Sequence, residues 1–140
     1  MANIQDLKKA VPDVEVWLAD LKRRLQWHDR EKVYLALMAT LHALRDSLPR
    51  DEAIYVGAQL PVLLRGLYYE GWHPSGRIAH ARSRDAFLAR IQEGVHREPG
   101  IDAEQVAHAV LSLLAERLPA GELEDAKAAT PKALRMFWPN

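Results

Sequence analysis

The sequence predicts an all-α protein, a compact bundle of about eight helices built from two tandem four-helix repeats with pseudo-twofold symmetry. Apolar residues recur at spacings of three and four along most of the chain, which is typical of amphipathic helices. Prolines and short polar residues divide these segments at the places where helices start and stop. The second half also resembles the first, which predicts the repeats.

The first predicted helix starts at Asp13, whose carboxylate is suited to accept from a free backbone N–H of the first turn. Val14, Trp17, Leu21 and Leu25 then follow at helical spacing and form one apolar face. The sequence therefore predicts an amphipathic helix packed on a core through this face.

Three further helices complete the first half. Asp29 caps a long segment that is apolar around most of its circumference, which is typical of a central, buried helix. Pro49 opens a short helix that ends near Ala58, and Pro61 opens another that ends near Tyr69, because proline fits the first turn of a helix.

The second half has the same organisation. Ser83 caps a helix, Gly100 interrupts the chain, and Asp102 caps the next helix. Pro119 and Pro131 each open a short final helix.

An ungapped shift of about half the chain aligns the two halves. The shift places LHALRDSLPRDE over LSLLAERLPAGE and AQLPVLLRGLY over AATPKALRMFW, so that Pro49 meets Pro119 and Pro61 meets Pro131. We predict a single domain, residues 1–140, with a first repeat over about 13–69, a connector over about 70–82 and a second repeat over about 83–139. One copy has only about 70 residues and is marginal alone, so the two are expected to share a core.

Composition limits the classes of function. The chain carries 19 basic and 19 acidic residues, so its overall charge does not favour nucleic acid or anionic membranes. It has no cysteine, which excludes disulfides and cysteine chemistry. No signal-peptide pattern or bilayer-length apolar run is found, and we expect a cytoplasmic protein without membrane contact.

The stretches LHALRDSLP, GAQLPVLLRGLYYEGWHP and RDAFLARI resemble a bacterial family, the domain of unknown function 2267. The resemblance runs from about Val14 to Pro139. It implies a small helical protein and supplies no activity, cofactor or catalytic residue.

The segment at the end of the first repeat is a candidate binding surface, because Tyr and Trp are enriched at interaction hot spots. It is also expected to plug the end of the repeat, because Leu67-Tyr68 aligns with Phe137-Trp138. The candidate surface consists of Arg65, Tyr68, Tyr69, Trp72, His73 and Arg77.

Arg65 and Arg135 stand at equivalent positions among apolar residues, and so do the acidic residues Glu52 and Glu122. A partly buried arginine usually pairs with a carboxylate. We predict structural ion pairs Glu52–Arg65 and Glu122–Arg135, or their cross-repeat equivalents. The alternative is a pair of anion-binding arginines near the pseudo-twofold axis.

The histidines follow no metal-binding spacing, and we expect no metal or cofactor. His42 and His108 lie on the two central helices, where a bond to a backbone carbonyl is the favoured role. His73 and His80, with Glu70, are an alternative metal or acid–base group. The run from Arg77 to Arg84 is a local basic patch beside aromatic residues, which leaves nucleic-acid binding through Arg77, Arg82 and Arg84 as a disfavoured alternative.

No phosphate-binding glycine loop or nucleophile elbow is present, and no catalytic residue is assigned. The sequence favours a non-enzymatic protein-interaction module that binds an unknown protein partner or a second copy of itself. The alternative is a small-ligand binder or enzyme with a site in the cleft between the repeats, lined by Arg65, Tyr69, Trp72, His73 and Arg77.

Overall fold

The computed structural model describes residues 3–74, 82–96, 98 and 100–140. Over these residues it is all-helical, with no strand and eight helices. In chain order they are α1 (Ile4–Leu25), α2 (Arg30–Ser47), α3 (Arg50–Ala58), α4 (Val62–Tyr69), α5 (Arg84–Gly94), α6 (Ala103–Arg117), α7 (Ala120–Ala129) and the 3₁₀ helix η1 (Lys132–Phe137). The predicted all-α class and the predicted number of about eight helices are confirmed over these residues.

Most helices begin where the sequence predicts. The carboxylate of Asp29 accepts from the backbone N–H groups of Glu31 and Lys32, and the carboxylate of Asp102 accepts from that of Gln105. Pro49, Pro61, Pro119 and Pro131 each immediately precede a helix. These caps and prolines fix the helix starts locally, independently of packing.

The first helix is longer than predicted. It begins at Ile4 rather than after Asp13, and Pro12 lies inside it. Asn3 and Asp6 form a reciprocal capping box, in which each side chain accepts from the other residue's backbone N–H, at 3.1 and 2.9 Å. The predicted cap at Asp13 is therefore wrong, because this upstream cap starts the helix earlier and the interior proline costs it only local hydrogen bonding.

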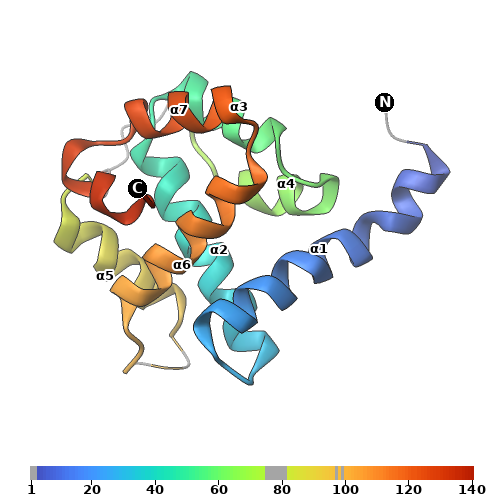
Figure 1. Ribbon diagram of the computed structural model, residues 1–140, viewed down its shortest axis with the longest axis horizontal. Helices are drawn as coiled ribbons and strands as arrows, with labels where there is room; N and C mark the ends of the chain where they lie inside the picture. Colours follow the sequence, from blue (N-terminus) through green and yellow to red (C-terminus); the bar gives the residue numbers. More distant parts are fainter. Residues whose placement is uncertain (1–2, 75–81, 97, 99) are drawn as a thin grey trace.

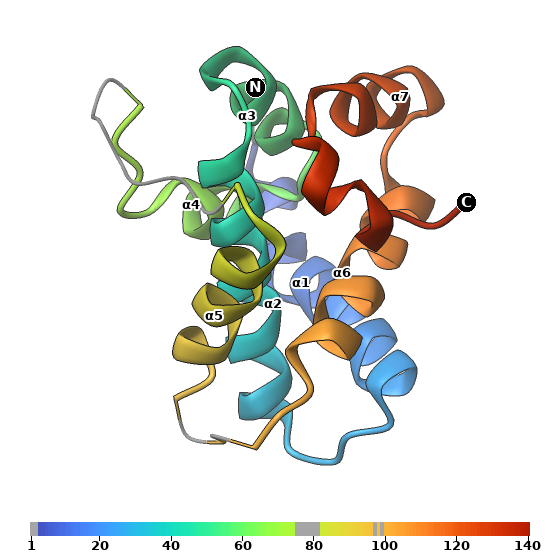
Figure 2. The same ribbon diagram turned by 90° about the vertical axis from the view of Figure 1, so that its left-hand side faces the viewer.

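Helix α2 occupies the middle of the bundle and is buried over most of its length, as its apolar circumference predicts. It packs against α1, α4, α5 and α6, and α1 also packs along α6 (Figure 1). Figure 2 shows α3 and α7 side by side at one end of the bundle. The core is formed by leucines of α1, α2 and α6, together with Tyr68, Phe87 and Phe137.

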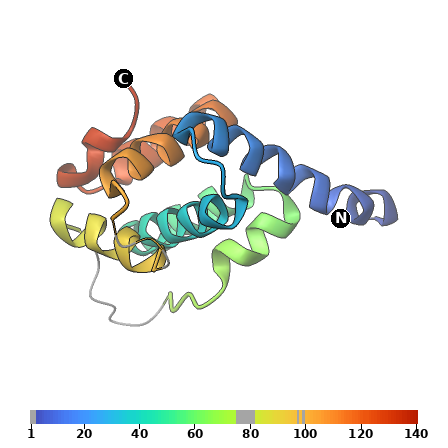
Figure 3. The ribbon, with the colours of Figure 1, turned by 90° about the horizontal axis from the view of Figure 1, so that it is seen from below.

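The N-terminal half of α1 leaves the body of the protein. In Figures 1 and 3 it extends past the other helices, and α1 begins at the far end of this projection. Its C-terminal half, from Val14 to Leu25, has its apolar face buried against the bundle. One helix therefore contributes both to the core and to an extended arm, which we call the α1 arm (Ile4–Asp13).

Candidate functional site

The aromatic residues at the end of α4 join this helix to α3. Tyr68 is completely buried and its hydroxyl donates to the carbonyl oxygen of Ala53 at 2.7 Å. The hydroxyl of Tyr69 donates to the carbonyl oxygen of Ile54 at 2.9 Å, and its ring stacks on Trp72 with centroids 5.6 Å apart. The two tyrosine rings cross Gly57 so closely that a Cβ atom there would lie 2.3 Å from the Tyr69 hydroxyl oxygen.

Tyr68 is thus a core residue, and its predicted place on a binding surface is wrong, because its hydroxyl is satisfied inside the protein. Tyr69 and Trp72 are partly buried against the core, and His73 is exposed. Arg77 and His80 lie outside the described residues. The structure therefore places only part of the predicted surface within reach of a partner.

The two equivalent arginines bind backbone carbonyls. Arg65 donates from Nη2 to the carbonyl oxygens of Ala58 and Leu60, at 3.1 and 3.0 Å. Arg135 donates to the carbonyl oxygens of Thr130 and Ala128, at 2.9 and 3.1 Å. Each arginine therefore stabilises the turn between two short helices. Main-chain carbonyl oxygens take the place of the carboxylate partners that the sequence suggested.

Glu52 and Glu122 instead face each other where α3 packs on α7. One carboxyl oxygen of each is buried, and among the described residues neither of these oxygens has a hydrogen-bond donor. Burial raises the pKa of Glu52 to about 8, with a further contribution from the hydrogen bond to Glu122 and from the charges of Glu122 and Asp125. Glu52 therefore keeps its proton near neutral pH, because burial and the neighbouring acidic groups disfavour its charged form.

A buried ionic cluster that the sequence did not predict holds α2, α4 and α5 together. Arg45 donates from Nη1 to the carbonyl oxygens of Tyr68 and Glu70 at 2.7 and 2.8 Å, and from Nε to the Asp46 carboxylate at 2.8 Å. Asp46 also pairs with Arg90 of α5. Burial alone would raise the pKa of Asp46, but the hydrogen bonds from Arg45 and Arg90 outweigh it and hold the pKa below its usual value.

Asp20 forms a similar centre between α1 and α6. It accepts from Arg24 at 2.9 Å and from Arg117 at 2.9 Å, and Arg23 lies 2.8 Å away. Burial acts to raise the pKa of Asp20, yet the hydrogen bonds from Arg117 and Arg24 lower it overall. In sequence, these charges are indistinguishable from solvated residues on helix surfaces, and only the crossing of the helices brings them together.

The two histidines of the central helices have different neighbours. Nε2 of His42 donates to the carbonyl oxygen of Leu67 at 2.8 Å, which is the backbone role that the sequence favoured. Burial lowers the pKa of His42, which keeps the ring neutral at pH 7. His108 is exposed, and its ring lies edge-on to Phe137 with centroids 5.2 Å apart.

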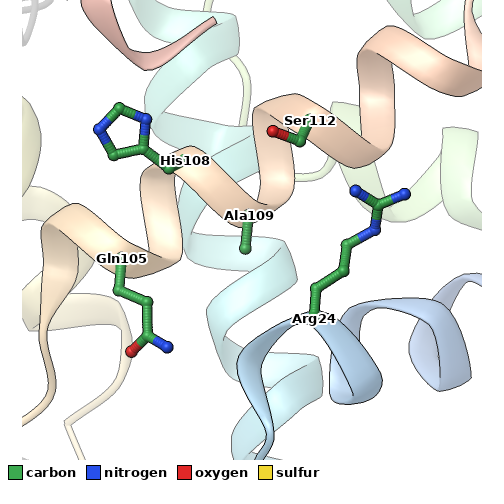
Figure 4. Close-up of a pocket in the computed structure, with 5 residues that line it drawn as sticks. All are labelled: Arg24, Gln105, His108, Ala109 and Ser112. Carbon is green, nitrogen blue, oxygen red and sulfur yellow. The ribbon is translucent and has the colours of Figure 1, made fainter. Parts of the chain in front are cut away.

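A pocket of about 340 Å³ lies between α1 and α6 (Figure 4). Its lining residues are Arg24, Gln105, His108, Ala109 and Ser112. The guanidinium of Arg24 is already paired with Asp20 and Glu116. In the part of the chain that the structure describes, no hydrogen bond joins His108 to Ser112 and no group of acidic or histidine residues is arranged to hold a metal ion. The pocket offers hydrogen-bonding groups, but it has no activated nucleophile.

The basic patch is only partly described. Arg82 is exposed, whereas Arg84 pairs with Glu104 and lies 3.5 Å from Asp85. A phosphate approaching Arg84 would have to displace these carboxylates.

The α1 arm carries the most conspicuous exposed apolar side chains. Ile4 is 63% exposed, Leu7 is 64% exposed and Val11 is 57% exposed. They continue the helical spacing by which Val14 and Leu21 enter the core, but no part of the described chain covers them. A sequence search for amphipathic faces finds this stripe only if α1 is extended upstream of Pro12.

A family profile described as an uncharacterized conserved protein, DUF2267, matches residues 14–137. The chain belongs to the DUF2267 family. The match begins at the point where α1 enters the body, so Ile4, Leu7 and Val11 precede the part shared with DUF2267. No curated protein matches the chain. Among the described residues, no helix is long and apolar enough to span a lipid bilayer.

Proposed function

We propose that the chain is a non-enzymatic protein-interaction module and that its recognition element is the α1 arm. The single observation that carries this proposal is the apolar stripe of Ile4, Leu7 and Val11, which is exposed on a helix that projects from the body. Large apolar side chains grouped on one helix face are costly in water, and such groups are typical of binding surfaces.

The body of the protein holds this arm in a fixed orientation. The arm continues without a break from the buried half of α1, which Asp20 fixes to α6 through Arg117. A recognition helix held in this way loses little conformational freedom on binding, because its backbone is already ordered.

The proposal includes the two-repeat organisation of the body of the protein. In support, α1 packs on α6 and α5 packs on α2, which are equivalent pairings if the repeats are related by a pseudo-twofold axis. Arg65 and Arg135 also bind equivalent carbonyl oxygens, those of Ala58 and Ala128. In this correspondence Arg84 matches Val14, so the α1 arm is an extension that precedes the repeat.

Site-specific photo-crosslinking in living cells tests the proposed function. A benzophenone amino acid at Leu7 lies on the stripe, whereas the same group at Val16, which is 52% exposed, lies on the opposite face of α1. The proposal predicts protein adducts from position 7 and few from position 16. Adducts from neither position, or equal adducts from both, would contradict it.

A second candidate function, a small-ligand binder, is favoured by the pocket between α1 and α6. Its polar groups are those of Gln105, His108 and Ser112, and none of the residues predicted to line a cleft belongs to it. A thermal-shift screen with small polar metabolites tests this alternative. It predicts a compound that raises Tm in the original protein and has no effect in a folded His108→Ala, Ser112→Ala double variant, and it fails if no compound raises Tm.

A further inference from the structure

The stripe on the α1 arm is one half of a longer pattern on the same helix. Ile4, Val11 and Leu18 are each separated by about two helical turns, so they lie along one line on α1. Ile4 and Val11 are exposed, whereas Leu18 is partly buried where the helix meets the body. The apolar line therefore runs from the free arm to the edge of the body.

A pocket lies at the inner end of this line. It is about 280 Å³ in volume, and it is formed between α1 and the start of α2. Leu18, Ala19 and Val33 supply apolar lining, and the charged residues Glu15, Lys22 and Arg30 surround them. A space of this size is large enough for an isoleucine or leucine side chain, and no residue within the described ranges of the chain fills it.

The outer and inner ends of the line are complementary. Val11 is midway between Ile4 and Leu18 in the sequence of α1. A twofold axis through Val11 therefore places a second α1 antiparallel to the first and brings Ile4 of each copy over Leu18 of the other. The same apolar side chain and the same pocket are then used twice, as an isologous interface requires.

The charges beside the line favour the antiparallel direction. Lys8 and Glu15 are two helical turns apart on the same flank, on opposite sides of Val11. Antiparallel pairing brings the same flank of both helices together and sets Lys8 of one copy close to Glu15 of the other, whereas parallel pairing would place this flank of the two copies on opposite sides of the contact. Glu15 already has an exposed contact with Arg30 of its own copy, 3.3 Å away. Lys8 of the second copy would therefore be a second positive neighbour of Glu15, and it would contribute more to the direction of pairing than to the affinity.

We infer that two copies of this chain pair antiparallel through α1, each inserting Ile4 into the pocket beside Leu18, Ala19 and Val33 of the other. The inference rests on the proposed function and names the partner of its recognition element. The contact is a single helix face, smaller than the roughly 800 Å² that each partner buries in a typical stable interface. We therefore expect a concentration-dependent dimer with a Kd of roughly 10 to 100 µM.

Sedimentation velocity between about 1 µM and 1 mM protein tests the pairing. The wild-type chain should shift from the 15.9 kDa of one chain toward twice that mass as concentration rises. Val11→Asp places two carboxylates at the axis and should weaken the dimer by at least about tenfold. Val16→Asp is the matched control, because it adds the same charge to the opposite face of the same helix and should leave Kd unchanged.

A charge exchange tests the direction of pairing. Lys8→Glu and Glu15→Lys should each weaken the dimer about two- to fivefold, and the double variant should recover most of the loss, because the cross-copy pair is restored with reversed sign. Circular dichroism checks that each variant folds. A double variant as weak as the two single changes combined would overturn the antiparallel arrangement.

The two proposals fail differently. A wild-type chain that remains monomeric at 1 mM, or Val11→Asp and Val16→Asp variants with the same Kd, would overturn self-pairing. If position 7 still crosslinks to a different protein in cells, the interaction module stands with another partner. If position 7 gives no adduct at all, the proposed function falls together with the inference.

Discussion

At the scale of single residues, this protein places charged and polar side chains at the crossings of its helices. Arg45, Asp46 and Asp20 are buried, and each is neutralised by partners from other elements or by main-chain carbonyls. Glu52 and Glu122 are different, since one carboxyl oxygen of each is buried without a hydrogen-bond donor among the described residues. Paired charges fix the geometry of a crossing, whereas a carboxyl with a raised pKa, such as that of Glu52, makes stability depend on pH.

Glu52→Gln should stabilise the protein at pH 7 to 8. A carboxyl whose folded pKa is raised binds its proton more tightly in the folded state, so stability falls as pH rises from about 4.5 toward the folded pKa of about 8. The glutamine amide needs no proton and can donate to Glu122. Allowing for partial exposure, we expect a gain of about 1 to 2 kcal/mol at pH 8 and almost none at pH 4.

Urea unfolding at several pH values measures this effect. Glu124→Gln, at an exposed position of α7, is the control and should change stability by less than about 0.5 kcal/mol at any pH. A Glu52→Gln variant whose stability keeps the wild-type pH slope between pH 5 and 8 would show that the carboxyl pair is not proton-linked.

Arg45→Ala should be severely destabilising, by about 3 to 5 kcal/mol, because it removes the donor to two carbonyl oxygens and the two hydrogen bonds that Arg45 gives to the buried Asp46 carboxylate. Arg50→Ala, an exposed change nearby, should cost less than about 0.5 kcal/mol. Chemical denaturation at pH 7 compares the two. A loss below about 1 kcal/mol for Arg45→Ala would mean that the cluster is dispensable.

At the scale of helices, most of the order was predictable and the packing was not. The prolines and the caps at Asp29 and Asp102 set the starts of helices through local hydrogen bonding, so they can be recognised in sequence. The start of α1 was not predicted, because a proline such as Pro12 is typical of a helix boundary and here lies inside the helix. The partners of Arg65 and Glu52 were not predicted, because they depend on how the helices pack. Helical periodicity predicts which face of a helix is buried, but it does not predict which helix covers that face.

The crossing of α2 and α5 depends on the absence of a side chain at Gly94. A Cβ atom there would lie 2.3 Å from the Cβ atom of Ala39. Gly94→Ala should therefore push the helices apart and destabilise the protein by about 1 to 3 kcal/mol. Gly66→Ala, with no atom within 4 Å of the new Cβ, is the control and should be neutral or stabilising by up to about 1 kcal/mol.

Thermal unfolding of the two variants measures the difference. Adding Ala39→Gly to Gly94→Ala should give a loss smaller than the sum of the two single losses, since room is restored at the same contact. Strict additivity would show that the two residues do not limit the approach of the helices.

At the scale of the whole molecule, the two halves are interleaved. Helix α1 packs on α6, and α5 packs on α2, so each half covers apolar faces of the other. Fragments 3–74 and 82–140, made separately, should lack a cooperative thermal transition, and an equimolar mixture should regain helical content. Circular dichroism tests this, and a cooperative transition in either fragment alone would contradict it.

Pulsed electron paramagnetic resonance tests the proposed pairing of two copies of this chain through α1. The natural chain has no cysteine, so Lys9→Cys or Arg23→Cys provides a single labelling site on the outer side of α1. In an antiparallel pair centred on Val11, the two copies of position 9 lie about 6 Å apart along the helix axis and the two copies of position 23 about 36 Å apart. Antiparallel pairing should give a clearly shorter label–label distance at position 9 than at position 23. Equal distances at both positions, or no coupling between copies at 1 mM protein, would contradict it.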